Sequence, residues 1–359
     1  MKQNLVGRLA FIDTSAFKAK NYQFHNHSLK TLRDYSDDEK IRILTTSVTI
    51  AEVRSHFPVL ANSAIKTIEE TRTKAKILRN LPDNPINGIF EKGLTEDVII
   101  STLNQSFDKF LGGDNIEIVS LKSVDSEAVF QDYFEGNAPF SIKKKDEFPD
   151  AFVLHAIKDL SQKRTYPVYI VSTDGDMKNF CDGERLIHLD SIDVLIDLIV
   201  RNDDDVKEPV KLADDLFEQF KGEIIHRVSD NLLEASYTVD SEDTYDVKIN
   251  NVIVEGKNII DLDDESVTFE IELVADIEAA TSEPDYDRSA FDPEDQRYIF
   301  TFYNVTRRKF LLKTSITVTI WFSETVKAAA ELGDVEMESS FDLESINSQL
   351  LSFEEKWFD

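Results

Sequence analysis

The stretch Lys143–Ile157, KKKDEFPDAFVLHAI, gives the clearest fold signal in this chain of 359 residues. Pro149 has a fixed φ and no N–H to donate, which suits the first turn of a helix. The carboxylate of Asp150 is favoured in the same turn by the free N–H groups and by the helix dipole. Residues 151–157 are apolar except for His155. The stretch therefore predicts a buried helix that presents Asp150 at its N-terminal end.

Strand and helix patterns alternate through the first 200 residues. Short apolar runs predict strands at 9–12, 41–46, 116–121, 168–173 and 185–189, and longer segments between them predict helices. This alternation predicts an α/β domain with a largely parallel sheet and helices on both faces. Functional sites in such sheets lie at the carboxyl ends of the strands. Segment 131–148, with its aromatic, glycine and proline residues, is expected to be a loop packed by its own side chains.

The hydrophobic period changes in the second half. Segment 202–209, NDDDVKEP, is charged and ends in proline, so we interpret it as a domain boundary. Residues 210–233 then have a mainly helical pattern. Apolar and polar residues alternate at 267–278 and 316–322, which predicts a largely antiparallel sheet with one face in water. Segment 281–296 is expected to be a long exposed loop or a disordered insert.

The two expected domains therefore cover residues 1–202 and 203–359, the first α/β and the second α+β. They differ sharply in charge. The formal net charge of the chain is -29. Residues 201–359 carry 15 Lys and Arg against 39 Asp and Glu, a net charge of -24, which leaves -5 for residues 1–200. The acidic half is expected to be a solvated surface, or to repel nucleic acid or contact a basic partner.

Composition also narrows the protein class. The single cysteine, Cys181, excludes an internal disulfide and a cysteine-based zinc site, and it fits a reducing compartment. The apolar patch near the start is broken by Arg8 and Asp13, so it is a poor signal peptide. No run approaches the roughly 20 apolar residues of a membrane span. We expect a cytoplasmic protein without membrane contact.

Four acidic residues stand where predicted strands end or predicted helices begin: Asp13, Glu52, Asp150 and Asp174. Carboxylates without cysteine or paired histidine favour a hard divalent cation such as Mg²⁺ or Mn²⁺. Two such ions can activate a water, orient a phosphodiester and stabilise the leaving oxygen. From composition alone, the inference stops at a site for Mg²⁺ or Mn²⁺.

Each acid also has an explanation that needs no metal. Asp13 fits a helix cap and Asp174 fits a turn. Glu52 fits the end of a capping box that begins at Thr49, and Asp150 fits a first-turn acid after proline. All four, however, fall at like ends of successive strand–helix units. That shared position favours one common site over four unrelated caps.

The same segments together resemble the PIN-domain nucleases. The segments are FIDTSAF, TTSVTIAEV, EFPDAFVLHAI and YIVSTDGDMKNF, and the resemblance covers roughly residues 5–200. The segment around KKKDEFPDAF is similar to a larger PIN-like branch rather than to the smallest toxin members. The resemblance implies that the four acids bind Mg²⁺ or Mn²⁺ and hydrolyse RNA. It also implies that Asp176 is an auxiliary metal-binding acid and that Thr14, Ser15 and Thr173 orient the carboxylates.

The third acid of the set has two acidic neighbours, because Asp146 and Glu147 could share or take over the role of Asp150. Basic side chains close to the acids in sequence could hold a phosphate backbone, although a lysine triplet in a loop is more often only solvated. These candidates for substrate binding are Arg54, Lys143, Lys144 and Lys145. The aromatic residues Tyr133, Phe134 and Phe140 could stack on bases, but packing within the loop is the stronger expectation.

The sequence and the resemblance together predict a metal-dependent endoribonuclease that cleaves single-stranded RNA by a two-metal mechanism. The family includes toxins and defence effectors, which implies such a role. The second domain is expected to make protein contacts, through regulation by a partner or homo-oligomerisation. Two alternatives stay open: a catalytically weak binding or regulatory module, favoured by the acidic second half, and a DNA nuclease, because the same chemistry cuts both backbones.

Overall fold

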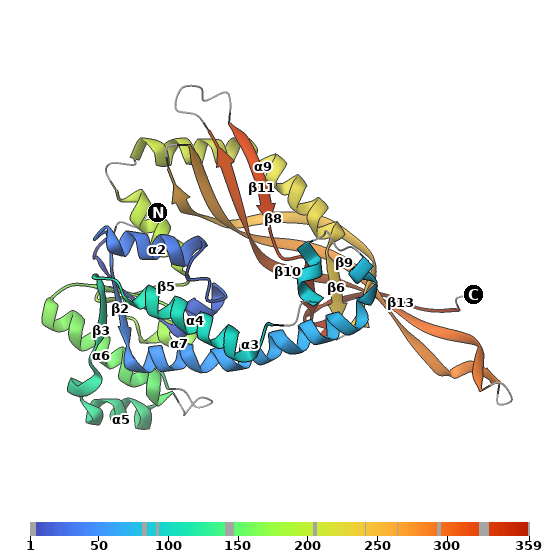
Figure 1. Ribbon diagram of the computed structural model, residues 1–359, viewed down its shortest axis with the longest axis horizontal. Coiled ribbons are helices and arrows are strands. Elements are labelled where there is room, and N and C mark those ends of the chain that lie inside the picture. Colours follow the sequence, from blue (N-terminus) through green and yellow to red (C-terminus); the bar gives the residue numbers. More distant parts are fainter. Residues whose placement is uncertain are drawn as a thin grey trace. The chain divides into compact units, whose positions relative to one another are not determined.

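The chain divides into two compact units, Met1–Asp204 and Asp205–Asp359. The computed structural model describes residues 5–80, 85–90, 93–140, 147–203, 207–240, 242–263, 265–292, 296–322 and 330–357. Figure 1 colours the first unit blue to green and the second yellow to red. The division falls within the charged segment 202–209.

A five-stranded parallel sheet forms the centre of the first unit. Its strands are β1 (Leu9–Ile12), β2 (Arg42–Thr46), β3 (Ile116–Val119), β4 (Val168–Val171) and β5 (Leu186–Leu189), in the order β3-β2-β1-β4-β5. β1 is central: Phe11 lies opposite Leu44 of β2 and Ile170 of β4. The prediction of a parallel sheet is confirmed. Because β1, β2 and β4 are neighbours, the residues that follow them gather at one edge of the sheet.

Eight α-helices surround this sheet among the described residues (Figure 1). They are α1 (Thr14–Ala19), α2 (His27–Asp37), α3 (Ser47–Lys74), α4 (Glu96–Leu111), α5 (Ser126–Glu135), α6 (Phe148–Arg164), α7 (Gly175–Phe180) and α8 (Ile192–Arg201), with short 3-10 helices η1 (Lys76–Asn80), η2 (Pro85–Phe90) and η3 (Leu121–Ser123). α6 and α7 cover one face of the sheet, where Leu154, Ile157 and Met177 pack with Phe11 and Ile170. The expected helix at Asp150 is therefore present and buried on its sheet side.

Part of the segment expected to be a loop is helical, so that prediction is wrong for residues 131–135. The side chain of Asp125 accepts hydrogen bonds from the N–H groups of Glu127 and Ala128 and so caps α5. Gly136 ends the helix in the left-handed conformation, with φ 69°. The expected turn at 174–176 is likewise the start of α7, which Asp174 caps.

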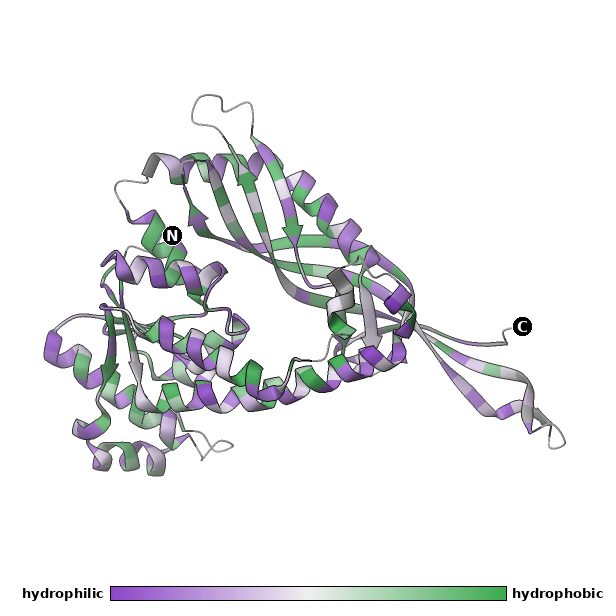
Figure 2. Ribbon diagram, in the orientation of Figure 1, coloured by the Kyte–Doolittle hydropathy of each residue, from purple (hydrophilic) through white to green (hydrophobic). Residues whose placement is uncertain are grey.

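The second unit combines one long helix, α9 (Lys207–Glu234), with largely antiparallel strands, of which only β6 and β12 pair in parallel in the described residues. The larger sheet has the order β11-β10-β9-β8, and β13 also pairs with β10; a smaller sheet has the order β12-β6-β7. The strands are β6 (Ser236–Val239), β7 (Glu242–Asp243), β8 (Tyr245–Leu262), β9 (Ser266–Asp292), β10 (Arg297–Trp321), β11 (Glu331–Glu336), β12 (Ser340–Leu343) and β13 (Gln349–Trp357), with η6 (Ser345–Asn347) before β13. Figure 2 shows hydrophobic and hydrophilic residues alternating along the long strands. The predicted antiparallel sheet is confirmed.

α9 packs on the larger sheet through aromatic residues. The ring centroids of Phe217 in α9 and Phe269 in β9 lie 5.4 Å apart. The ammonium of Lys257 lies 4.1 Å from the Phe217 centroid and 3.0 Å from a carboxylate oxygen of Asp214. Neither α9 nor any other helix in the described ranges is long and apolar enough to cross a membrane.

Residues 281–292 extend strand β9 and form one arm of a β-hairpin with β10, so the prediction of a loop or disordered insert is wrong for them. β9 continues to Asp292 and β10 begins at Arg297, with Thr281 opposite Thr306. The rings of Tyr286 and Tyr298 pack across the two strands, 5.0 Å apart. Cross-strand pairs of this kind stabilise a hairpin that the Pro, Asp and Glu content of the segment disfavours.

Candidate active site

Asp13 follows β1 directly and caps α1. Its N–H donates to the Val171 carbonyl of β4 at 3.0 Å, which fixes the backbone at the sheet edge. Its Oδ2 accepts hydrogen bonds from the Ser15 N–H at 3.1 Å, from Ser15 Oγ at 2.5 Å and from Ser172 Oγ at 2.9 Å. Asp13 is only 6% exposed. The sequence DTS thus holds one carboxylate in a defined position at the end of the central strand.

Two serine hydroxyls connect the ends of β1 and β4. Ser15 Oγ and Ser172 Oγ lie 3.1 Å apart, and both contact Asp13. Ser15 Oγ also accepts a hydrogen bond from the N–H of Thr173 at 3.0 Å. The predicted orienting role therefore falls on Ser15 and on the buried Ser172, which sequence reasoning missed, whereas Thr173 contributes its backbone amide.

Asp174 lies at the neighbouring strand end and is joined to Asp13 through Ser172. Its N–H donates to Ser172 Oγ at 3.0 Å, and its Oδ1 accepts from the N–H of Asp176 at 2.7 Å. Asp174 is thus the N-cap of α7, whereas the metal-free explanation expected a turn. A cap can still face a shared site, so its metal-binding role and that of Asp176 stay predictions.

Glu52 is held one strand away, on the helix that follows β2. The N-cap of this helix is Thr46, whose Oγ1 accepts from the Thr49 N–H at 3.1 Å. Glu52 therefore lies in the second turn, and the capping-box interpretation that started at Thr49 is wrong. Its Oε2 accepts a hydrogen bond from Thr14 Oγ1 at 2.8 Å. This contact fits the predicted orienting role of Thr14.

Asp150 occupies the first turn of α6, next to the N-cap residue Glu147. Burial raises the pKa of Asp150 most, followed by a side-chain hydrogen bond with Glu147 and by the charges of Asp13, Glu52 and Glu147. Together they bring it from 3.8 to about 8. Asp150 is therefore close to the carboxylates of two other elements.

The pKa of Glu52 is raised by the same neighbourhood. Burial raises it most, the hydrogen bond from Thr14 opposes this, and the charges of Asp13 and Glu147 raise it further. His56, one helical turn beyond Glu52, lowers it. The structure thus groups Asp13, Glu52, Glu147 and Asp150; we call these four residues the acid cluster. The structure brings Glu147 close to Asp150, as the sequence alternative required.

The comparison with family models decides the identity of this unit. A family model described as PIN domain matches residues 10–177. This range contains all four residues of the acid cluster. Residues 10–177 form a PIN domain. PIN domains have a nuclease-type fold and generally use divalent metal ions.

Two other comparisons found nothing similar. Neither the search of curated proteins nor the search of solved structures returned a match to the chain. The second unit lies wholly outside the range that matches the PIN model.

The donors of the acid cluster fit a hard divalent cation. All are carboxylate oxygens, which Mg²⁺ and Mn²⁺ prefer. A cation among them would replace mutual repulsion with attraction and lower the raised pKa values. With the side chains as they stand, no three His, Cys, Asp or Glu residues in the described parts of the chain converge at metal-binding spacing. The hydrogen bond between Asp150 and Glu147 is the contact that a cation would displace.

Of the basic residues predicted to bind substrate, Arg54 is the one that lies within the described residues. Arg54 lies against α4, with Nη2 2.5 Å from Asp108 Oδ1, Nη1 3.3 Å from Asn104 Oδ1, and its guanidinium 5.9 Å from the Phe107 ring centroid. Its contact with substrate stays a prediction. Asp146 and the three lysines before it fall in segment 141–146, which lies outside the described residues.

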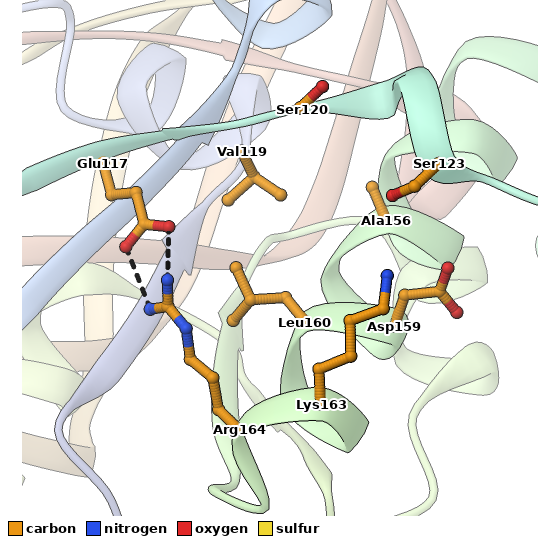
Figure 3. Close-up of a pocket in the computed structure, with 9 residues that line it drawn as sticks. All are labelled: Glu117, Val119, Ser120, Ser123, Ala156, Asp159, Leu160, Lys163 and Arg164. Atoms are coloured by element: carbon orange, nitrogen blue, oxygen red, sulfur yellow. Dashed lines mark hydrogen bonds and ion pairs between the residues drawn. The ribbon is translucent and has the colours of Figure 1, made fainter.

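A separate pocket of about 220 Å³ lies between β3 and α6 of the PIN domain (Figure 3). Val119 and Leu160 form its apolar wall. Two hydrogen bonds between Arg164 and Glu117, of 2.9 and 2.6 Å, close one side. No residue of the acid cluster lines this pocket, so it is not part of the candidate active site.

Three residues of the site were missed by sequence reasoning: Thr46, His56 and Ser172. Thr46 and Ser172 are both fully buried polar residues at the carboxyl end of a buried strand. A hydroxyl residue that ends an apolar run is therefore a usable signal for a group that serves the site. His56 had a different signal, since it stands four residues after Glu52 and so on the same helix face.

Proposed function

We propose that this PIN domain is a metal-dependent endoribonuclease that hydrolyses phosphodiester bonds of single-stranded RNA. The supporting observation is that the carboxyl groups of Asp13, Glu52 and Asp150, which come from three elements, lie close together. Burial, the hydrogen bond with Glu147 and the nearby charges of Asp13, Glu52 and Glu147 together bring the pKa of Asp150 to about 8. Grouped, half-buried acids destabilise a fold unless a cation or a proton compensates them. The arrangement therefore favours a cation site over a set of structural caps.

Each residue of the site has a separate task in this proposal. Asp13, Glu52 and Asp150 hold the cation, with Asp174 and Asp176 as further acids at the next strand end. Bound there, Mg²⁺ or Mn²⁺ activates the attacking water and stabilises the leaving oxygen of the phosphodiester.

The hydroxyl groups keep the carboxylates in place. Ser15 and Ser172 fix one oxygen of Asp13, and Thr14 fixes one oxygen of Glu52. A hydrogen bond between the carboxyl groups of Glu147 and Asp150 requires one proton. Binding of a cation at the site would release this proton.

Cleavage of labelled RNA tests the proposal. The full chain is incubated with single-stranded RNA in Mn²⁺, Mg²⁺ or chelator, beside Asp13→Asn and Glu52→Gln. The control is Glu69→Gln, an exposed acid on the same helix as Glu52. We expect cleavage with either ion by the unchanged chain and by the control, and none by the two site variants. Cleavage that survives chelation or both site substitutions contradicts the metal mechanism.

The two alternatives are decided by the same assay. Single-stranded DNA as a second substrate distinguishes a DNA nuclease, because the same two-ion chemistry cuts both backbones. Binding of RNA without cleavage of any substrate favours a regulatory module. A toxin or defence role in the cytoplasm predicts that expression of the unchanged chain arrests growth, whereas Asp13→Asn does not.

We further propose that the second unit makes protein contacts, either with a regulatory partner or with a second copy of the chain. Its net charge, 14 Lys and Arg against 37 Asp and Glu or -23, would disfavour contact with a polyanion and favour a basic surface. Sedimentation of the full chain at low and high salt tests this. A monomer under all conditions contradicts homo-oligomerisation.

A further inference from the structure

Two phenylalanines on α5 are unusually exposed. Phe130 is 48% exposed and Phe134 is 79% exposed. They stand one helical turn apart, with ring centroids 6.5 Å apart and ring planes inclined by 29°. We call Phe130 and Phe134 the α5 aromatic pair. Large apolar side chains gathered on a surface in this way mark a contact site.

The pair rests on a rigid base of further aromatic rings. The centroid of Phe130 lies 5.4 Å from that of Phe148, and the centroid of Tyr133 lies 5.3 Å from that of Phe134 and 4.9 Å from that of Phe148. Phe140, which is only 3% exposed, packs on Tyr133 and Phe148 at 5.4 and 5.0 Å. The exposed rings are therefore held before any ligand arrives, which lowers the entropic cost of binding.

Phe148, on which these rings pack, is the first residue of α6, and the same helix carries Asp150 of the acid cluster. The α5 aromatic pair therefore lies near the acid cluster. Phe148 and Asp150 are two positions apart, about 200° around the helix, and so project from opposite sides of its first turn. On one side α5 packs against α6 (Figure 1). On the other side Asp150 meets Asp13 and Glu52. Asp150 and Phe148 are therefore separated by about one helix diameter, roughly 10 Å, and the α5 aromatic pair lies beyond Phe148.

The chemistry of α5 favours bases over phosphates as ligands. Its sequence, SEAVFQDYFE, contains no Lys or Arg. Asp132 contacts Nε2 of His155 at 2.9 Å, and the carboxylate of Glu135 accepts hydrogen bonds from Gln131 and Asn137. The helix thus presents ring faces beside acids, which repel a phosphate backbone but accept a stacked base.

We propose that Phe134 and Phe130 stack on unpaired bases of the RNA substrate, a few nucleotides from the bond that is cleaved. Only a single strand offers free base faces, so the contact selects unpaired RNA. This inference rests on the proposed nuclease function and assigns it a second binding site.

Steady-state cleavage by the full chain gives the first test. Phe134→Ala is expected to raise KM about 5- to 100-fold, the range given by base–aromatic stacking, with kcat unchanged. Phe134→Trp keeps a stacking face and should restore KM. The control is Phe353→Ala, a phenylalanine of the second unit that is 56% exposed. If the chain cleaves RNA and Phe134→Ala leaves KM unchanged, the stacking proposal is overturned while the nuclease proposal stands.

Abasic substrates give the second test, because they remove the base without touching the protein. In a scan of single abasic sites on either side of the cleaved bond, at least one position should raise KM for the unchanged chain and leave KM of Phe134→Ala unaffected. If abasic sites raise KM equally for the unchanged chain and for Phe134→Ala, the base and the ring act independently and the proposal is overturned. A change in sedimentation of Phe134→Ala with an unchanged KM would identify a protein contact instead. Failure of the unchanged chain to bind or cleave any RNA refutes the nuclease proposal itself.

Discussion

At Asp150, burial and three neighbouring carboxylates act on the same proton. They bring its pKa from 3.8 to about 8. Between these values the folded chain binds more protons than the unfolded chain, so the free energy of unfolding falls as pH rises from about 4 to about 8. The raised pKa of Glu52 adds to this fall. The metal-free protein is therefore predicted to be less stable at pH 8 than at pH 6.

Asp150→Asn tests the origin of this pH dependence. Urea unfolding in chelator should show a weaker fall in stability from pH 6 to pH 8 than in the unchanged chain, and a more stable protein at pH 8. Two parallel pH profiles would mean that Asp150 is ionised normally in the folded chain.

The hydroxyl of Ser172 should matter for metal affinity. It donates to Asp13 and accepts from the Asp174 N–H, so its removal frees one oxygen of Asp13. Ser172→Ala is predicted to weaken Mn²⁺ binding about 10-fold, as expected for groups that orient ligands. Ser101→Ala, a hydroxyl on the surface of α4, is the control. An unchanged affinity in a folded Ser172→Ala protein would remove Ser172 from the site.

The sequence located the acids well but not their partners. Asp13 follows β1 and Asp150 opens α6, because strand ends and helix starts have local signals. Ser172 directly follows the apolar run of β4, but that position alone does not show which of Ser172 and Thr173 faces Asp13. Successive residues at a strand end point in opposite directions, and only the register of β4 against β1 decides which one meets Asp13.

At the scale of elements, Thr46 caps the start of α3, the helix that contains Glu52. Thr46→Ala removes the side-chain acceptor for the Thr49 N–H and should lower the free energy of unfolding by about 1 kcal/mol. We also expect weaker Mn²⁺ binding, because the first turns of α3 hold Glu52 against Thr14. Thr46→Ser keeps the acceptor and should behave like the unchanged chain in denaturant unfolding. If Thr46→Ser lowers the free energy of unfolding as much as Thr46→Ala does, the methyl group of Thr46 stabilises the fold rather than the cap.

Element boundaries failed where long-range contacts override local composition. The capping box at Thr49 was a valid local pattern. However, the helix is capped three residues earlier by Thr46, at the end of β2. Segment 281–296 has few strand-forming residues, but pairing of β9 with β10 and packing of Tyr286 on Tyr298 hold it as a hairpin. In segment 131–148 the internal aromatic packing was expected correctly, whereas the capped helix α5 was not.

At the scale of the whole molecule, the charge difference between the units predicts an effect on RNA binding. Removal of residues 205–359 takes away a net charge of -23 out of the total of -29. The fragment 1–204, once shown to be folded by circular dichroism, should bind single-stranded RNA more tightly than the full chain, and the difference should shrink at high salt. Equal or weaker binding by a folded fragment would contradict an inhibitory role of the acidic unit.

The architecture of both units followed from periodicity, but the function of the second did not. Alternation at 267–278 and 316–322 gave the antiparallel sheet, since one face of it is in water. Nothing in that alternation identifies a partner. The PIN domain differs because its acids stand at the ends of strands and the starts of helices, positions that leave a trace in the sequence.

Titration calorimetry with Mn²⁺ tests most directly whether Asp13, Glu52 and Asp150 form one cation site. The full chain should bind Mn²⁺ at pH 7 with release of a proton, detected by comparing two buffers, because Asp150 and Glu147 share one before loading. Asp13→Asn, Glu52→Gln and Asp150→Asn should each weaken binding at least about 10-fold, whereas Glu69→Gln should not. Unchanged Mn²⁺ affinity in the three folded site variants would contradict the account.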